Sequence, residues 1–307
     1  MPTSKSSLIN LTQYSKTKVE SLFEKSLNLK ARYKKGTSFS APTMTGQTAA
    51  LLFFEPSTRT RFSFEAACAR SGFHPLVLDG SSGTSLEKGE TVIDTIRNIE
   101  AMQPQFFIIR CNQKTNLAQL AEQMNVPVIN AGWGSEGHPT QALLDMLTVY
   151  EKNKVLENKK ILFIGDVKHS RVVASHFELA KILNYTIGIC APIEFLPDSA
   201  NKKVFKSFEN LEPGLAWADV VIALRVQKER HDDKPFGAEK YRQTFGLNKN
   251  KLNSLSAEGW IMHPGPINYG IEMEENILQD PRTLILQQVE NGVFLREALI
   301  RNLFEET

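Results

Sequence analysis

Short apolar runs alternate with longer segments of mixed polarity along most of the chain. The runs are rich in Val, Ile and Phe, are three to six residues long and are followed by polar or turn-forming residues, as is typical of buried strands. The strands that this pattern predicts are Ala49–Phe54, Pro75–Leu78, Phe106–Ile109, Val126–Ile129, Ile161–Ile164, Thr186–Ile189, Val220–Leu224 and Trp260–Met262.

The longer segments between these runs are predicted helices, because their apolar residues recur at helical spacing. They are Lys16–Arg32, Thr60–Arg70, Thr91–Met102, Leu117–Met124, Pro139–Glu151, Val172–Leu183 and Gly292–Leu303. A strand followed by a helix, repeated along a chain, indicates a parallel sheet that helices cover on both faces. Ligands bind such sheets outside the carboxyl ends of the strands, so we expect the chemistry just after each strand.

The chain divides near its middle at a polar, charged stretch, Glu151–Lys160. A length of 307 residues corresponds to two domains at roughly 150 residues each. We therefore predict two α/β halves, with the helix Pro139–Glu151 as a bridge from one to the other.

Composition and charge exclude several classes of protein. Hydrophobic residues make up 41% of the chain, enough for a core that needs no disulfide or metal. Lys and Arg number 36 against 34 Asp and Glu, which argues against a nucleic-acid binder, since that function needs a basic face. No apolar run approaches the ~20 residues of a membrane span, and the N-terminus has no apolar segment of the kind that signal peptides have. Cys68, Cys111 and Cys190 lie far apart, and we interpret them as reduced thiols of a cytoplasmic protein.

The strongest chemical feature follows the first predicted strand. There Ser57-Thr58-Arg59-Thr60-Arg61 opens a predicted helix just after Pro56. The first turn of a helix offers free N–H groups and the positive end of the helix dipole, and this one adds three hydroxyls and two guanidiniums. The combination favours an anion with several oxygens, above all a phosphate. The alternative is that Ser57 is an ordinary helix cap and Arg59 a solvated surface residue.

Three further strands lead into arginine-bearing segments. Arg110 and Arg225 come directly after their strands, and Arg171 follows a short turn. A guanidinium can clamp an oxyanion with two hydrogen bonds. These arginines would line one pocket with Arg59 if their strands shared one sheet edge or one cleft, which the sequence does not establish.

A literal G-x-G-x-x-G motif occupies Gly132–Gly137, after a strand and before a helix. A dinucleotide site is one interpretation, but His138 and Pro139 stand where that site needs free N–H groups. His138 and Gln141 are three residues apart and so share a helix face. Either His138 caps the helix and Gln141 is solvated, or His138 polarises a substrate carbonyl and Gln141 binds an amide.

Two loops complete the candidate chemistry. Ser81–Glu90 is either a surface loop or a lid that carries Lys88 to a ligand. His263-Pro264-Gly265-Pro266 forms a stiff turn that exposes backbone carbonyls, or is merely structural. The sequence has no P-loop, nucleophile-elbow or H-E-x-x-H motif and no evident metal cage, so we expect neither metal nor cofactor. A cationic, hydroxyl-rich site suits a reaction between two anionic substrates by positioning and charge stabilisation.

The chain resembles the catalytic chains of the aspartate transcarbamoylase family. The motifs of that family occur here in the same order, along nearly the whole length. The matching segments are Phe53–Glu65, Thr84–Thr91, Arg110, Asn130–Asp145, Gly165–Val172, Leu224–Arg230 and His263–Pro266. S-T-R-T-R is shared with the ornithine transcarbamoylases. Lys88 and the segment after Arg225 fit an acidic second substrate instead, and the S-M-G and H-C-L-P segments typical of the ornithine enzymes are absent.

The resemblance implies two doubly wound domains, each a mainly parallel sheet flanked by helices, joined by bridging helices. Residues 1–138, completed by the C-terminal helix 291–307, would bind carbamoyl phosphate, and residues 139–290 would bind L-aspartate. The implied reaction transfers the carbamoyl group to the aspartate amine and gives N-carbamoyl-L-aspartate and phosphate, an early step of de novo pyrimidine synthesis.

The resemblance also assigns roles to single residues. The phosphate would be held by Ser57, Thr58, Arg59, Thr60 and Arg110. The carbamoyl oxygen would be polarised by Thr60, Arg110 and His138, and the carbamoyl amide would be received by Gln141 and backbone carbonyls near Pro264 and Gly265.

For aspartate, the resemblance implies that Arg171 binds the α-carboxylate and that Arg225 and Gln227 bind the β-carboxylate. Lys88 and Ser85 would come from a neighbouring subunit of a homotrimer, and Thr84 could take the role of Ser85. Because no side chain is an obvious strong base, we expect the departing phosphate to accept the proton of the amine and His138 to be a neutral hydrogen-bond donor. Whether a regulatory chain or a dihydroorotase binds as a partner stays open.

Overall fold

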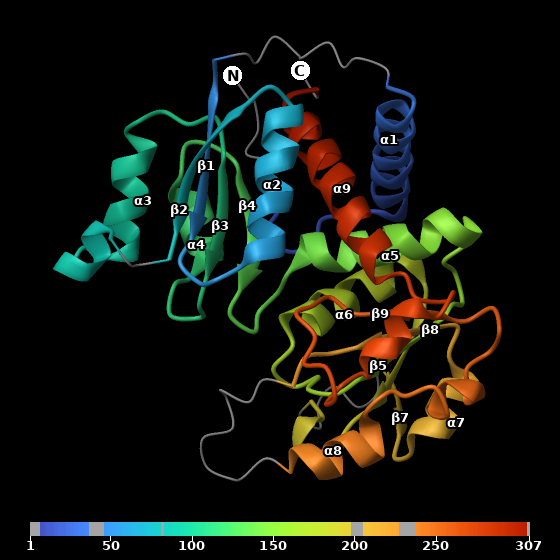
Figure 1. Ribbon diagram of the computed structural model, residues 1–307. Coiled ribbons are helices and arrows are strands. Elements are labelled where there is room, and N and C mark those ends of the chain that lie inside the picture. The colour runs from blue at the N-terminus through green and yellow to red at the C-terminus, as the bar shows by residue number, and fades with distance from the viewer. Residues whose placement is uncertain (1–6, 37–45, 81–82, 198–204, 227–236, 306–307) are drawn as a thin grey trace. The chain divides into compact units, whose positions relative to one another are not determined.

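The computed structural model describes residues 7–36, 46–80, 83–197, 205–226 and 237–305 (Figure 1). The chain forms two compact units, Met1–Leu147 with Val289–Thr307, and Thr148–Gln288. The boundaries fall inside helices α5 (Pro139–Asn153) and α9 (Ile285–Glu305), so each of these helices contributes to both units. None of the helices in the described ranges is long and apolar enough to cross a membrane.

The first unit is built on a four-stranded parallel sheet in the order β2-β1-β3-β4. Its strands are β1 (Thr48–Phe53), β2 (His74–Asp79), β3 (Phe107–Cys111) and β4 (Val128–Trp133). All four predicted strands of this half are confirmed, with ends that differ from the prediction by one to four residues. The largest shift is at the end of β4, which continues to Trp133 and so includes the first two residues of the glycine motif.

Helices cover both faces of this sheet, as predicted. They are α1 (Lys16–Lys34), α2 (Thr58–Arg70), α3 (Val92–Glu100) and α4 (Leu117–Gln123). Alternate strand residues, Ala50 with Leu52 and Phe107 with Ile109, pack against α3 and α4 in one hydrophobic cluster. Figure 1 shows α1, α2 and α9 on the opposite side of the sheet. Burial on both faces explains why these strands read as continuous apolar runs.

The second unit contains a five-stranded parallel sheet in the order β7-β6-β5-β8-β9. The predicted strands are found as β5 (Lys160–Ile164), β6 (Thr186–Cys190), β8 (Val220–Ala223) and β9 (Trp260–Met262), and the predicted helix as α6 (Arg171–Leu183). Together the two sheets confirm the expected fold class of two parallel-sheet domains flanked by helices.

Three elements of the second unit were missed, each with a weak sequence signal. β7 (Phe205–Phe208) is a short edge strand with two exposed polar residues, and α8 (Ala238–Phe245) is mostly polar. α7 (Leu211–Trp217) contains Pro213 and Gly214, which ordinarily argue against a helix. The glycine is there for close packing, because a Cβ on Gly214 would lie 3.2 Å from Leu162 Cδ2.

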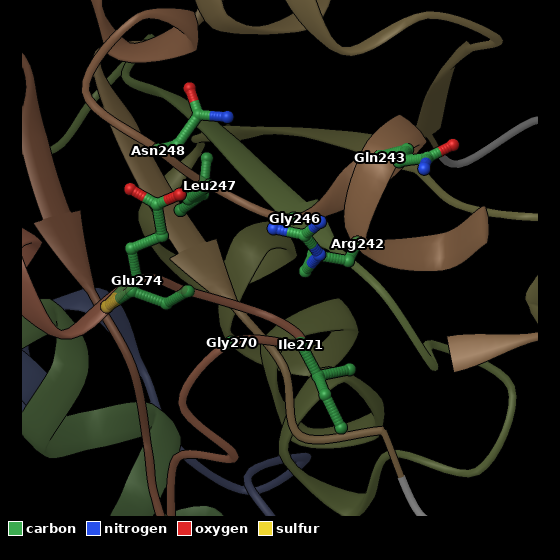
Figure 2. Close-up of a pocket in the computed structure, with 9 residues that line it drawn as sticks. Arg242, Gln243, Gly246, Leu247, Asn248, Gly270, Ile271 and Glu274 are labelled. Atoms are coloured by element: carbon green, nitrogen blue, oxygen red, sulfur yellow. The ribbon is translucent and has the colours of Figure 1, made fainter. Parts of the chain in front are cut away.

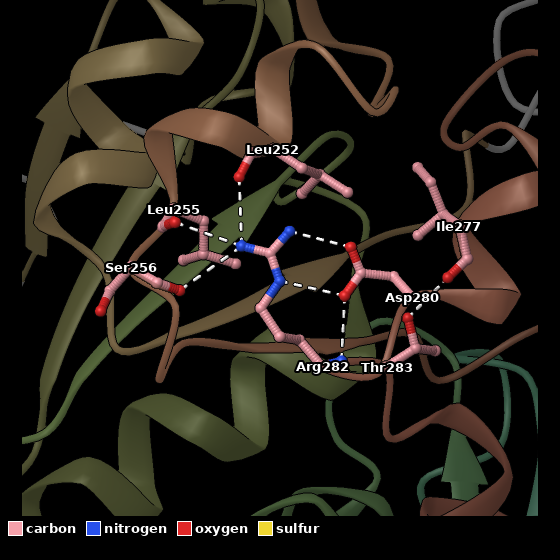
Figure 3. Close-up of polar contacts among 7 residues, drawn as sticks. All are labelled: Leu252, Leu255, Ser256, Ile277, Asp280, Arg282 and Thr283. Carbon is pink, nitrogen blue, oxygen red and sulfur yellow. Dashed lines mark hydrogen bonds and ion pairs between the residues drawn. The ribbon is translucent and has the colours of Figure 1, made fainter.

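Arg282 ties the end of a short 3-10 helix (Lys251–Ser254) to the turn that precedes α9 (Figure 3). Its Nε and Nη2 donate to the Asp280 carboxylate at 3.0 and 2.8 Å. Its Nη1 lies within 3.2 to 3.4 Å of the carbonyl oxygens of Leu252, Leu255 and Ser256. One guanidinium therefore satisfies carbonyl groups that the end of a helix leaves without intrahelical partners.

We expect Arg282→Ala to lower the free energy of unfolding by about 1–3 kcal/mol at pH 7, the usual range for losing hydrogen bonds to a charged group. Arg282 holds the pKa of Asp280 below its usual value, chiefly through their hydrogen bond. That stabilisation is present above the unfolded-state pKa of about 3.9 and is lost as the pH falls through the lower folded-state pKa. Urea titrations should therefore show that the difference in the free energy of unfolding between wild type and Arg282→Ala becomes smaller as the pH is lowered from 7 to below about 4.

Arg242→Ala is the matched control, because Arg242 makes the same kind of ion pair with Glu239 at 2.8 Å but on an exposed helix face. Exposed pairs contribute little to stability, so this variant should unfold much as the wild type does. Equal losses in the two variants would contradict the role given to Arg282.

Candidate active site

The order of the strands marks one position in each sheet where a ligand is expected. In the first sheet the chain steps from β1 to β2 on one side and then places β3 and β4 on the other side of β1. In the second sheet the order reverses in the same way between β5 and β8. Parallel α/β sheets bind ligands at the carboxyl ends of the two strands that flank such a switch point.

The four arginine-bearing segments flank these two switch points in pairs. In the first sheet Arg59 lies in α2, which follows β1, and Arg110 lies within β3 rather than after it as predicted. In the second sheet Arg171 opens α6, which follows β5, and Arg225 comes two residues after β8. The predicted strands therefore do not share one sheet edge, and the pairing of the segments follows from a strand order that the sequence does not reveal.

At the first switch point the side chains of Ser57 and Arg110 meet. Arg110 is paired in register with Phe53 of β1, and its Nη1 donates to Ser57 Oγ at 3.1 Å. Its Nε lies 3.8 Å from Glu55 Oε2. Ser57 precedes α2, but its hydroxyl makes no capping hydrogen bond to the helix. Ser57 thus occupies the N-cap position without the side-chain bond of an ordinary cap, and its hydroxyl lies against the Arg110 guanidinium.

The first turn of α2 offers the N–H groups and hydroxyls that the sequence predicted. Thr58 and Arg59 are exposed, and Thr60 is buried. The sequence suggested two available guanidiniums, but that of Arg61 is engaged by two carboxylates. Its Nη1 lies 3.1 Å from Asp79 Oδ2, and its Nε lies 3.5 Å from Glu65 Oε1. These two carboxylates therefore compete with any ligand for the Arg61 guanidinium.

His138 and Gln141 are both buried at the start of α5. The carbonyl oxygen of His138 accepts hydrogen bonds from the N–H groups of Gln141 and Ala142 at 3.0 and 3.2 Å. The amide Nε2 of Gln141 donates to Asp145 Oδ1 at 2.8 Å. Gln141 is thus held by Asp145 rather than solvated, and this bond directs the amide nitrogen inward, so that its oxygen is the atom suited to accept from a ligand N–H.

A buried arginine of α9, which the sequence reasoning missed, lies behind this pair. Arg296 is 3% exposed, and its Nη1 donates to Ser63 Oγ of α2 at 2.8 Å. Its Nη2 donates to Thr140 Oγ1 at 3.4 Å, and the same hydroxyl lies 3.5 Å from His138 Nδ1. Burial lowers the pKa of Arg296 to about 9, with the charge of Asp145 opposing the shift. The signal in the sequence was a pair of charged residues, Arg296 and Glu297, within the otherwise apolar stretch Val293–Ile300.

This chain of contacts links His138 to Arg296 through one hydroxyl. A guanidinium donates and does not accept, so Thr140 Oγ1 accepts from Arg296. The same oxygen has a second acceptor position as well as its own hydrogen, so its contact with His138 Nδ1 is compatible with a proton on either ring nitrogen.

The glycine motif serves a turn rather than a dinucleotide. Gly132 and Gly134 have φ angles of 121° and 44°, and the N–H of Trp133 donates to the carbonyl oxygen of Gly137 at 2.9 Å. A Cβ on Gly134 would lie 2.8 Å from the backbone nitrogen of Gln113. The helix that follows starts at Pro139, which has no N–H group to offer a pyrophosphate.

At the second switch point the turn after β5 is held by Asp166 and Ser170. The fully buried Asp166 carboxylate lies 2.8 Å from His169 Nδ1, and Ser170 Oγ accepts from the N–H of Val173 at 3.3 Å. Ser170 thereby caps α6, whose first residue is Arg171. Gly165 (φ 113°) gives close contact with the neighbouring strand, because a Cβ there would lie 3.1 Å from the carbonyl oxygen of Leu224.

The neighbouring strands β8 and β9 carry the other predicted residues of this unit. Arg225 is half-buried two residues beyond β8, and Gln227 lies outside the described residues. After β9, Gly265 has a φ of 69° and donates its N–H to His263 Nδ1 at 2.7 Å, and the peptide bond that follows it is cis. Pro264 and Gly265 are thus held in a tight turn, as predicted.

The loop that carries Lys88 contains a short 3-10 helix, Ser85–Lys88, in which Ser85 and Lys88 are exposed and Thr84 is half-buried. Glu90 ties the end of the loop to α3 by accepting from Thr95 Oγ1 at 2.8 Å and from Asn98 Nδ2 at 2.6 Å. This anchoring leaves Ser85 and Lys88 on the surface of the first unit.

Two other features of the described residues bear on the choice of site. Figure 2 shows a pocket of the second unit lined by side chains such as Arg242, Asn248 and Glu274, and none of the candidate residues lines it. Within the ranges that the structure describes, His, Cys, Asp and Glu side chains form no group of three or more that could hold a metal ion.

Comparisons with known proteins agree with the motifs. Residues 6–151 match the carbamoyl-phosphate-binding domain of aspartate/ornithine carbamoyltransferases, and residues 157–303 match the Asp/Orn-binding domain of the same group. An aspartate carbamoyltransferase catalytic subunit of Chlorobium phaeovibrioides is 36% identical over 307 aligned residues, which cover 98% of this chain and 99% of that one.

The fold is shared with solved structures of both kinds of carbamoyltransferase. An aspartate transcarbamoylase from Trypanosoma cruzi, in complex with carbamoyl phosphate and aspartate, superimposes with a TM-score of 0.87 at 25% identity and covers 97% of this chain and 96% of that one. An ornithine carbamoyltransferase from Thermus thermophilus gives 0.83 at 26% identity, with 97% and 99% covered. The fold therefore does not separate the two activities, but the sequence relationship does, and the chain belongs to the family of aspartate carbamoyltransferase catalytic subunits.

Proposed function

We propose that this chain transfers the carbamoyl group of carbamoyl phosphate to the amine of L-aspartate, with N-carbamoyl-L-aspartate and phosphate as products. The reaction belongs to de novo pyrimidine synthesis. The observation that carries the proposal is the placement of two arginine-bearing segments at each of the two switch points. The substrates bring a phosphate and two carboxylates, which are the groups that guanidiniums bind best.

The first unit supplies the phosphate site in this proposal. Ser57, Thr58, Arg59, Thr60 and Arg110 bind the phosphate oxygens, with the N–H groups of the first turn of α2 as further donors. The contact between Ser57 and Arg110 supports this assignment, because it brings the segment after β1 and the end of β3 together. We propose residues 1–138 with the helix 291–307 as the carbamoyl-phosphate domain.

The carbamoyl group is proposed to be polarised by Thr60, Arg110 and His138. Its amide is received by the Gln141 oxygen and by backbone carbonyls near Pro264 and Gly265. The hydrogen bond from Gln141 Nε2 to Asp145 supports the acceptor role of Gln141. These donors stabilise the negative charge that develops on the carbamoyl oxygen as the amine attacks.

The aspartate site is proposed to lie in residues 139–290. Arg171 binds the α-carboxylate, and Arg225 with Gln227 binds the β-carboxylate. Lys88 and Ser85 are supplied by a neighbouring subunit of a homotrimer, and their exposure on the surface loop supports a role outside their own unit.

The chemistry needs no metal or cofactor in this proposal. The amine nitrogen bonds to the carbamoyl carbon, the bond from that carbon to the phosphate oxygen breaks, and the departing phosphate accepts a proton from the amine. His138 stays neutral and donates a hydrogen bond, since no strong base is found among the proposed residues. A cytoplasmic location is part of the proposal, supported by three buried cysteines that form no disulfide.

The test is phosphate release from carbamoyl phosphate with a panel of amino acids that includes L-aspartate and L-ornithine. We expect turnover with aspartate alone, because Arg171, Arg225 and Lys88 attract carboxylates and repel the side-chain ammonium group of ornithine. Turnover with ornithine in place of aspartate would contradict the proposed acceptor. Binding of carbamoyl phosphate without turnover for any amino acid would contradict the proposed enzyme and indicate a binding protein with the same fold.

A further inference from the structure

Glu272 is a buried acid that none of the proposed roles uses. It lies on the loop after β9 and is 1% exposed. Its Oε1 accepts hydrogen bonds from the N–H of Val226 at 2.8 Å and from Asn268 Nδ2 at 2.9 Å, and its Oε2 accepts from the N–H of Asn268 at 2.9 Å. Asn268 Nδ2 also lies 3.3 Å from the carbonyl oxygen of Val226. We call these three residues the Glu272 clamp.

The clamp holds the chain just beyond the point where the hydrogen bonds between β8 and its neighbouring strands end. β8 pairs with β9 only as far as Ile222, which lies opposite Met262, and the last bond to β5 is from the N–H of Leu224 to the carbonyl oxygen of Ile164. Val226 lies two residues beyond the donor of that last bond. The clamp takes over at once, since it engages both the N–H and the carbonyl group of Val226.

A buried carboxylate is a costly way to hold a loop, because burial disfavours its charge. Burial raises the pKa of Glu272, and the N–H donors of Val226 and Asn268 oppose that shift. Three donors converge on its two oxygens, and only a carboxylate accepts at both. The arrangement specifies one backbone position for residue 226 with more precision than an apolar contact would.

We propose that Glu272 is a positioning residue, which acts through Val226 to fix the backbone that presents Arg225 to the carboxylate of the amino-acid substrate. The inference rests on the proposed role of Arg225. Bidentate pairing of a guanidinium with a carboxylate depends on orientation, and a displacement of ~1 Å at a substrate-positioning group can lower the rate by ~10²-fold. The same clamp links Arg225 to the loop that bears Pro264 and Gly265, because Asn268 belongs to that loop.

The sharpest test is Glu272→Gln, which keeps the shape of the side chain. A glutamine has one oxygen, so whichever way its amide turns, an N–H₂ group faces a backbone donor, of either Val226 or Asn268. We expect the KM for aspartate to rise by about tenfold or more, while the KM for carbamoyl phosphate stays within about twofold of wild type. A purely structural role would move both constants, or lower the amount of folded enzyme, without this split.

Two further variants test whether the effect of Glu272→Gln comes from a general loss of folded protein. Glu274→Gln is the matched control, because Glu274 lies two residues away at the pocket of Figure 2, beside Leu247 and Asn248, and it should behave as wild type. Asn268→Ala removes both bonds of Asn268 Nδ2 and leaves the backbone donors in place. It should raise the aspartate KM in the same direction as Glu272→Gln and by less.

A double-mutant cycle with Arg225→Ala decides whether Glu272 acts through Arg225. If it does, Glu272→Gln adds less than about twofold to the aspartate KM once Arg225 is absent, since residues that act as a unit are not additive. Full additivity would overturn the proposal, as would an unchanged aspartate KM in Glu272→Gln or an equal rise in both KM values. Failure of the proposed function is a separate result, since the wild-type enzyme would then not carbamoylate aspartate at all.

Discussion

Replacing Arg110 with alanine is expected to lower kcat/KM for carbamoyl phosphate by about 10²- to 10³-fold, or about 2.7–4 kcal/mol, the usual effect of removing one donor aimed at developing charge. Arg110 lies on β3 at the first switch point, with its guanidinium against Ser57 and near Glu55. In the proposed reaction it touches both the phosphate and the carbamoyl oxygen. Its loss should therefore lower kcat as well as raise the KM for carbamoyl phosphate.

Arg61→Ala is the control for this experiment, because Arg61 belongs to the same motif but is engaged by Glu65 and Asp79. Steady-state phosphate release at saturating aspartate measures both variants, and circular dichroism checks that both are folded. Arg110→Lys should fall between alanine and wild type, since it keeps the charge and loses the fork of donors. Similar activity for the Arg110 and Arg61 alanine variants would contradict the site.

Replacing Arg225 with alanine is expected to raise the KM for aspartate by about 10²-fold and to leave the binding of carbamoyl phosphate intact. Truncating one partner of a desolvated, hydrogen-bonded charge pair costs about 2–5 kcal/mol. Arg225 lies in the second unit, and the segments proposed to bind the phosphate lie in the first, so the loss should be confined to the amino-acid substrate.

Initial rates at varied aspartate and calorimetric titration with carbamoyl phosphate separate these two effects. Arg242→Ala provides a control on the same unit, since its guanidinium pairs with Glu239 on an exposed face. An aspartate KM equal to that of wild type in the Arg225 variant would contradict the assignment, and so would a matching loss of carbamoyl-phosphate affinity.

The strands and helices were largely predictable because their signals are local. Runs such as Leu51–Phe53 and Ile161–Ile164 are fully buried, and continuous burial leaves a continuous apolar pattern in the sequence. The missed elements lack that pattern. β7 buries little of its length, and α7 owes its glycine to the packing of Leu162 against it, a contact between residues about fifty positions apart.

The chemistry of the site was predictable where it is carried by neighbouring residues and unpredictable where it depends on partners far away. The hydroxyls of Ser57, Thr58 and Thr60 follow from the motif itself. That Arg61 is taken up by Asp79 and that Arg296 lies behind Thr140 are facts of packing. No periodicity reports such contacts.

The sequence by itself determined the alternation of strands and helices and the sheet type, and it supplied the proposed anion-binding side chains, because each depends on residues adjacent along the chain. Only the tertiary structure decided the order of the strands, and with it which arginine-bearing segments flank each switch point. It also decided that the buried Glu272 holds the backbone next to Arg225. The physical reason is that strand order and buried hydrogen bonds are set by contacts between distant parts of the chain, which no local pattern encodes.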